Sequence, residues 1–179
     1  REANEGKPLE TSTASYLYVG LIADSLRFSI NTTTSKTLEM GSYLLNSGLD
    51  VNELNNQVFG VKLELYRFSN YLRSIADYSN PKCVTCIVKT DDYVKYGIDA
   101  NEAKTKVSIF GEILGIKVWA LFVEEQKGIY SASLRSHTLN VRNIAEKYGG
   151  GGHDCAVGIP SLTFEQCEMV IKELRELVA

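Results

Sequence analysis

The sequence has few cysteines, no excess of basic residues and no long apolar run. With 19 Lys and Arg against 22 Asp and Glu among 179 residues, its formal net charge is −3. A surface that binds long DNA or RNA needs many basic side chains on one face. No stretch approaches the roughly 18 to 20 apolar residues of a membrane span, and the polar start lacks the apolar core of a signal peptide. We therefore expect a cytoplasmic protein with no membrane and no long nucleic acid among its partners.

The 4 cysteines are too few and too scattered for a disulfide scaffold. Cys83 and Cys86 have the spacing of a zinc or redox pair, but Cys155 and Cys167 lie far away and are differently spaced. We interpret the first pair as core side chains of a strand within residues 83–90, and a zinc or redox site as the alternative.

The first 79 residues have mostly helical patterns. An apolar run over 16–23 ends at Asp24, which predicts a carboxylate at the end of a largely buried segment, where it requires a partner. Hydroxyl residues precede a helix expected within 36–48, and Asp50 opens a further short helix. Apolar residues recur at helical spacing over 61–78. The abrupt apolar start indicates a missing upstream part.

The pattern changes at residues 79–81, so we place a domain boundary between residues 79 and 80. After the strand in 83–90, a helix is expected over 99–114, and then two strands over 116–125 and 129–136. A hairpin-length loop with glycine separates these strands, so they should pair antiparallel. A short helix and a final helix follow, and the second half is therefore a mixed α+β domain.

The least ordinary local feature is a run of four glycines, Gly149 to Gly152, followed by His153. Backbone N–H groups without side chains can approach an anion closely, and a histidine beside them can donate to a phosphate oxygen. A helix stop with a loose loop is the plainer alternative. Arg135, at the end of an expected strand and next to Ser136, suits bidentate phosphate recognition, although most such arginines are simply solvated.

Two segments together resemble a known family. Residues 131–159 resemble the DHH-associated domain, whose signature is a Ser-x-Arg-Ser strand, a short helix, and Gly-Gly-Gly-His followed by Ala-x-Gly. Residues 16–45 resemble the last motif of the DHH catalytic domain, with Asp24 at its aspartate. Ser25 and Leu26 stand where that motif usually has Thr-Gly. The positions that carry both matches are Gly20, Asp24, Phe28, Thr33, Thr34, Ser133, Arg135, Ser136, Gly150, Gly151, Gly152, His153, Ala156 and Gly158.

This resemblance implies an α/β chain: a mostly helical C-terminal remainder of a DHH catalytic domain over 1–79, and an α+β DHH-associated domain with a mixed sheet over 80–179. It implies that Asp24 is a manganese ligand. The family's other metal motifs, Asp-His-His among them, would precede residue 1, so we expect no activity and no filled metal site from this segment alone. The implied substrate-phosphate site, across the cleft between the domains, consists of Arg135, Ser136, Gly150, Gly151, Gly152 and His153.

For the whole protein the resemblance implies a phosphoesterase in which two manganese ions activate water. Its expected substrates are short oligoribonucleotides, 3'-phosphoadenosine 5'-phosphate (pAp), or both, and a homodimer is compatible with it. One alternative is a phosphodiesterase of cyclic dinucleotides such as c-di-AMP, or of linear dinucleotides. Another is a non-catalytic module that binds nucleotide phosphates, and a third is a fold relic that serves only in oligomerisation.

Overall fold

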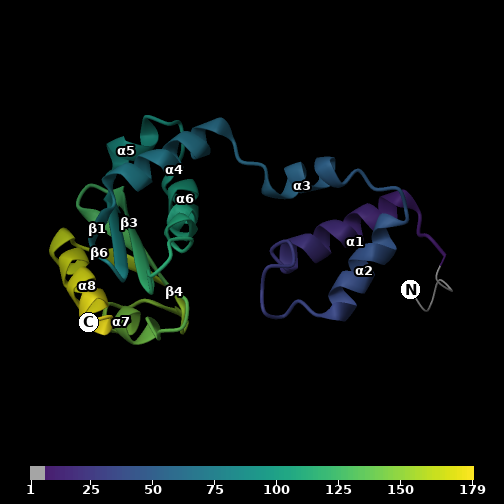
Figure 1. The fold of residues 1–179 in the computed structure, drawn as a ribbon. Coiled ribbons are helices and arrows are strands. Elements are labelled where there is room, and N and C mark those ends of the chain that lie inside the picture. The colour runs from purple at the N-terminus through teal and green to yellow at the C-terminus, as the bar shows by residue number, and fades with distance from the viewer. Residues whose placement is uncertain (1–6) are drawn as a thin grey trace. The chain divides into compact units, whose positions relative to one another are not determined.

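The structure is a computed structural model that describes residues 7–179 (Figure 1). By their packing, the residues divide into two units, Arg1–Val61 and Lys62–Ala179. The first has one hydrophobic core, and the second has a core on each face of a sheet. Within the described range, no helix combines the length and apolar character that crossing a bilayer requires.

The first unit is helical, as expected. Ala14, Tyr18 and Ile22 recur every four residues along the first helix and form its buried stripe. Thr34 caps the second helix, since its hydroxyl accepts a hydrogen bond from the backbone N of Thr37. The three helices are α1 (Thr11–Asp24), α2 (Ser35–Leu45) and α3 (Val51–Phe59), the last capped by Asp50.

The prediction that Asp24 ends a largely buried segment is wrong. The apolar run lies on a helix with only one buried face, so Tyr16 and Leu17 are 81% and 52% exposed. Asp24 is the last residue of α1 and is itself exposed. Because solvent reaches this carboxylate, it needs no buried partner.

The second unit is built on a six-stranded mixed sheet in the order β1-β2-β3-β4-β6-β5. Strands β2 and β3 pair in parallel, and every other neighbouring pair is antiparallel. The antiparallel hairpin of β3 and β4 confirms the prediction for the two strands on either side of Gly128, which has a positive φ of 78°. The strands are β1 (Asp77–Asn80), β2 (Cys83–Val88), β3 (Val118–Gln126), β4 (Ile129–Ser136), β5 (Gly151–His153) and β6 (Ala156–Leu162).

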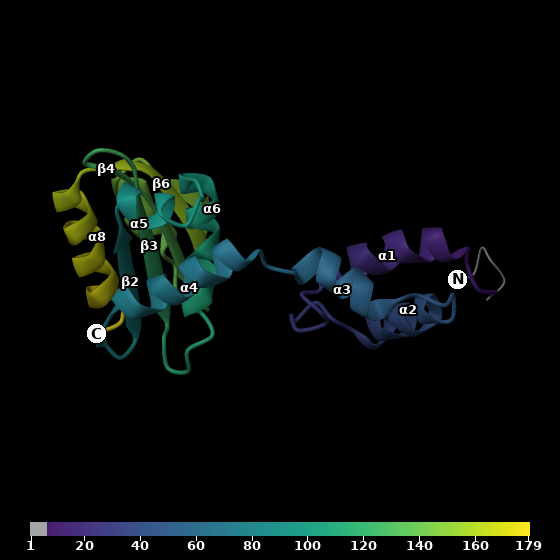
Figure 2. The same cartoon turned by 90° about the horizontal axis from the view of Figure 1, so that it is seen from above.

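Helices cover both faces of this sheet (Figures 1 and 2). Cys83 belongs to the core on the face of α7 and α8, whereas Cys86 belongs to the core beneath α4, α5 and α6. Alternation along β2 thus points the two thiols to opposite faces, so they are core side chains and not a zinc or redox pair. The helices are α4 (Leu63–Ile75), α5 (Thr90–Val94), α6 (Ala100–Lys104), the 3-10 helix η2 (Thr105–Phe110), α7 (Arg142–Lys147) and α8 (Phe164–Leu177).

The helix expected over 99–114 is shorter in the structure. Asp99 and Glu102 form the predicted capping box of α6, but the chain continues as η2 and turns at Gly111. A Cβ on Gly111 would lie 2.5 Å from the indole of Trp119 on β3. The close approach of this turn to the sheet therefore requires glycine and ends the helix early.

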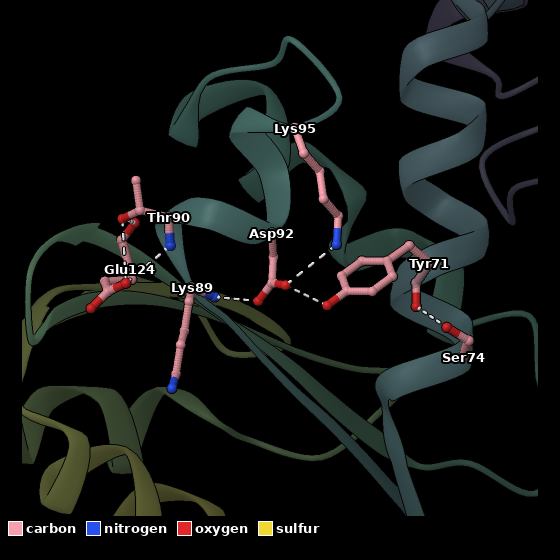
Figure 3. Close-up of polar contacts among 7 residues, drawn as sticks. All are labelled: Tyr71, Ser74, Lys89, Thr90, Asp92, Lys95 and Glu124. Carbon is pink, nitrogen blue, oxygen red and sulfur yellow. Dashed lines mark hydrogen bonds and ion pairs between the residues drawn. The ribbon is translucent and has the colours of Figure 1, made fainter.

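Helix α4 packs within the second unit, although the change of sequence pattern lies after it at residues 79–81. Phe68 and Leu72 are fully buried in the core beneath α4. The hydroxyl of Tyr71 donates to Asp92 of α5, and this bond raises the pKa of Tyr71 to about 12. Lys95 Nζ lies 3.9 Å from the centroid of the Tyr71 ring and 3.6 Å from Asp92 Oδ1 (Figure 3). Both apolar and polar contacts thus hold α4 in this unit.

A carboxylate joins the β3–β4 hairpin to the start of α5. Glu124 Oε1 accepts from the backbone N of Gly128 at 2.8 Å, and Oε2 accepts from the backbone N of Thr90 at 3.0 Å. These donors lower the pKa of Glu124 below its ordinary value. Figure 3 shows the contact with Thr90. Glu124 therefore helps to fix the hairpin from which β4 runs toward the candidate site.

Candidate functional site

Arg135 and His153, far apart in the sequence, share one face of the sheet. The register pairs Arg135 of β4 with Ala156 of β6, and Ala156 with His153 of β5. Residues directly opposite one another in a sheet have side chains on the same face. On the other side of Arg135, the same row continues to Trp119 of β3. The structure therefore brings these two predicted site residues together.

A second row runs parallel to the first on this face. It contains Leu121, Ser133, Gly158 and Gly151, from β3 to β5. Leu121 is fully buried, whereas Gly158 and Gly151 at the other end are exposed. The helices that cover β3 therefore leave the β4–β6–β5 part of the face open. A groove of about 380 Å³ lies on this open part, lined by Lys104, Glu125, Ser131, Ala132, Ser133, Gly158, Ile159 and Pro160.

The Arg135 guanidinium is half-buried, and some of its N–H groups are hydrogen-bonded. Its Nη1 donates to the backbone carbonyls of Leu134 at 2.8 Å and Val157 at 3.0 Å. Burial lowers the pKa of Arg135 from its ordinary value, but an arginine remains charged at neutral pH. Within residues 7–179, its remaining N–H groups form no hydrogen bond. Arg135 is thus held in place by two carbonyls and keeps donors for an anion.

Backbone conformation or close packing requires glycine at three of the four positions in this run. Gly149 has a φ of 73° and ends α7, and Gly152 has a φ of 140°, so both adopt conformations that favour glycine. A Cβ on Gly150 would lie 2.5 Å from the carbonyl oxygen of Gly158. A Cβ on Gly151, in contrast, would meet nothing within 4 Å. Gly151 is the one glycine of this run whose lack of a side chain the described packing does not require.

The side chains of Ser136 and His153 lie on opposite faces of the sheet. Ser136 follows Arg135 on β4, so its side chain faces the other side of the sheet, where its hydroxyl donates to the carbonyl of Leu139. Its backbone N donates to the carbonyl of Cys155 at 3.0 Å, which fixes the turn between β5 and β6. His153 is exposed at the end of β5. A direct role of Ser136 toward a ligand stays a prediction, whereas Arg135 and His153 share the open face.

Ser133 is a further candidate for the site: it belongs to the Ser-x-Arg-Ser motif, but it was not assigned to the substrate-phosphate site from the sequence alone. It lies two positions before Arg135, so it faces the same open surface, beside Gly158. Its hydroxyl can both donate and accept. The alternation of the strand could have identified it.

Asp24 is in the first unit and precedes a strained turn. Leu26, Arg27 and Phe28 have φ values of 44°, 59° and 64°, a left-handed conformation that side chains disfavour. The buried Ser25 supports the turn, since its hydroxyl donates to the carbonyl of Leu21 at 2.6 Å and accepts from the backbone N of Phe28 at 3.0 Å. Leu26 stands where the last motif of the DHH catalytic domain, which residues 16–45 resemble, usually has glycine. The turn thus keeps a glycine-like conformation without its glycine.

The described residues do not form a metal site by themselves. Across residues 7–179, no three His, Cys, Asp or Glu side chains gather as a group that could hold a metal ion. Manganese prefers several oxygen or imidazole ligands, and Asp24 supplies one carboxylate. Residues 7–179 alone therefore do not fit the manganese pair that the resemblance implies.

Relatives and one family profile match this chain. The profile described as "DHHA1 domain" matches residues 80–179. The bifunctional oligoribonuclease and PAP phosphatase NrnA of Bacillus subtilis (strain 168) is 31% identical over 172 residues, 96% of this chain and 55% of that protein. A probable bifunctional oligoribonuclease and PAP phosphatase NrnA of Streptococcus mutans is 29% identical over 95% of this chain and 55% of that protein. The chain spans about half the length of these relatives.

Among solved structures, an exopolyphosphatase-related protein from Bacteroides fragilis matches with a TM-score of 0.80. The match covers 93% of this chain and 50% of that protein, at 21% identity, and so shows the fold alone. The profile match includes the open sheet face, with its arginine and its glycine-histidine strand. The chain therefore belongs to the DHHA1 domain family, and the family resemblance of its sequence is confirmed.

Proposed function

We propose that this chain is the substrate-binding part of a phosphoesterase that acts on short oligoribonucleotides and pAp. The observation that carries the proposal is the row in which Arg135 and His153 flank Ala156 on an open face of the sheet. Two N–H donors on either side of a small residue suit a phosphate group. The names of the NrnA relatives support this substrate class.

The charge of the chain supports a small substrate rather than a long one. Its formal net charge of −3 offers no excess of basic side chains along which a long strand could bind. On the described open face, by contrast, a guanidinium, an imidazole and two exposed glycines lie within two neighbouring rows. Such a compact arrangement suits one terminal phosphate.

The metal role of Asp24 is also a proposal. Asp24 would contribute one carboxylate to a manganese centre whose other ligands are not among residues 7–179, and a bound metal would supply the activated water of the hydrolysis. The residues described here bind and orient the substrate. A homodimer and a cytoplasmic location remain predictions.

Titration calorimetry with pAp tests the binding role. Arg135→Ala should weaken pAp binding at least about tenfold, because charge-assisted bonds to phosphate are lost. Arg142→Ala is the matched control, since Arg142 is an exposed arginine of the same unit whose Nε pairs with Glu146 at 2.7 Å. We expect the control to bind like the wild type. Equal affinity of Arg135→Ala and wild type would remove Arg135 from the site.

A further inference from the structure

We propose that His137 and Trp119 form a platform on which the base of a bound nucleotide stacks. The proposal rests on the proposed function and deepens it. It assigns base contact to His137 and Trp119, two residues that the family resemblance does not include in the implied site.

The backbone register places both rings next to Arg135. Trp119 of β3 is the direct cross-strand partner of Arg135, so the two side chains lie on the same face of the sheet. His137 comes two residues after Arg135, and its backbone N donates to the carbonyl of Lys117 at 3.3 Å, which extends the β3–β4 pairing by one position. His137 therefore lies on the same face as Arg135, about 7 Å further along the strand.

The two rings are in contact and only one of them is exposed. Their centroids lie 4.9 Å apart, with an angle of 54° between the planes. Trp119 is 7% exposed, and its indole also packs closely against Gly111. His137 is exposed. A buried indole thus holds an imidazole that solvent, or a ligand, can reach.

This arrangement matches the shape of a nucleotide. A ribose separates the phosphate of a nucleotide from its base, and the backbone separates Arg135 from His137 by a similar length. Aromatic side chains bind bases by stacking, and they tolerate any base because each has a π face. With the phosphate at Arg135, the base can lie against His137. The platform predicts that the base contributes to the free energy of binding. It also predicts that the affinity depends little on which base the nucleotide carries.

Fluorescence of Trp119 provides the first test, because Trp119 is the single tryptophan of the chain. The probes are AMP and ribose 5-phosphate, which differ by the base. Stacking on His137 should change the emission of the indole beneath it when AMP is added, and ribose 5-phosphate should leave the emission nearly unchanged. AMP that binds by calorimetry without altering the emission would contradict the platform.

Three variants separate stacking from charge. His137→Ala should weaken AMP binding about tenfold and leave ribose 5-phosphate binding unchanged, whereas His137→Phe should retain AMP binding because it keeps a ring. His137→Lys, which has a positive charge but no ring, should bind AMP as weakly as His137→Ala. Retained binding in His137→Lys together with loss in His137→Phe would overturn the proposal, since the histidine would then act on phosphate. Thermal unfolding of each variant checks that the Trp119 packing survives.

The same experiment distinguishes this proposal from the proposed function. If wild type binds ribose 5-phosphate and AMP equally and His137→Ala changes neither, phosphate binding stands and the platform is wrong. If wild type binds neither probe, the proposed function fails and the platform fails with it.

Discussion

Arg135 and His153 occupy one cross-strand row of the sheet, with only Ala156 between them. Between Arg135 and His153 the row crosses β4, β6 and β5, the last three strands in spatial order. Gly151 lies in the adjacent row on the same face, opposite Gly158. Two donor side chains thus lie beside a stretch of the sheet surface that has no side chains.

Gly151→Ala should reduce ligand binding without reducing stability. The added methyl group meets no protein atom within 4 Å, so the free energy of unfolding should change by less than about 0.5 kcal/mol. On the open face, however, the methyl group occupies space where a phosphate would approach the backbone. We expect pAp affinity to fall about tenfold in calorimetry.

Gly150→Ala and Gly152→Ala are the matched controls, and they should lose stability instead. Their Cβ atoms would lie 2.5 Å from the carbonyl oxygens of Gly158 and Ala156, respectively. Each change should cost about 1 to 3 kcal/mol in urea unfolding. If Gly151→Ala binds pAp like the wild type, the ligand does not approach this glycine.

Leu26→Gly should stabilise the first unit. Leu26 has a φ of 44° and is 56% exposed, so glycine relieves left-handed strain and loses little packing. Glycine also has more conformational entropy in the unfolded chain, which opposes this effect. On balance we expect the free energy of unfolding of the first unit to rise by about 0.5 to 1 kcal/mol. Hydrogen exchange of the α1 amides measures this gain, because it reports opening of that unit.

Leu17→Gly is the control for that change. Leu17 is 52% exposed in the interior of α1, where glycine should cost about 1 kcal/mol. The two Leu→Gly changes should thus have opposite signs. Loss of hydrogen-exchange protection of the α1 amides in both variants would mean that the turn after Asp24 is not strained.

Glu124→Gln should destabilise the second unit in a pH-dependent way. Two backbone N–H groups bind different oxygens of Glu124, and glutamine keeps only one acceptor oxygen, so the cost should be about 1 to 2 kcal/mol at neutral pH. Because the pKa of Glu124 is lowered in the folded state, its contribution is complete above the unfolded pKa of about 4.5 and is lost as pH falls through the folded value.

Urea unfolding at a series of pH values tests the pH-dependent contribution of Glu124 to stability. The stability difference between Glu124→Gln and wild type should therefore shrink below about pH 4. Glu168→Gln, at an exposed position of α8, should match the wild type throughout. A difference that persists unchanged in acid would show that the charge of Glu124 is not involved.

The chain by itself should not hydrolyse pAp or a short oligoribonucleotide in the presence of manganese. Asp24 is one ligand, and the described residues offer no group of three, so metal affinity should be weak and unchanged in Asp24→Asn. Chromatography of the products and calorimetry with manganese measure the two expectations. Turnover by this chain would mean that its own residues assemble a metal centre.

Sequence patterns predicted most helices and the antiparallel hairpin of β3 and β4 because these depend on local spacing and turn residues. They did not predict the exposure of Asp24, since an apolar run does not reveal which helix face is covered. The rows that join Trp119, Arg135 and His153 depend on long-range register, which no local pattern encodes. The motif resemblance supplied Arg135 and His153, and strand alternation could have added Ser133, whereas the Trp119–His137 contact required the structure.

Amide chemical shifts of the 15N-labelled chain, followed as pAp is added, test most directly where the phosphate binds. We expect shifts at Arg135, Gly151 and His153, on the open face of β4, β6 and β5. A different groove of about 510 Å³ lies beside α8 and includes Asp77, Lys172 and Arg175. Shifts confined to that groove, with the open face unchanged, would contradict the assignment of the phosphate site.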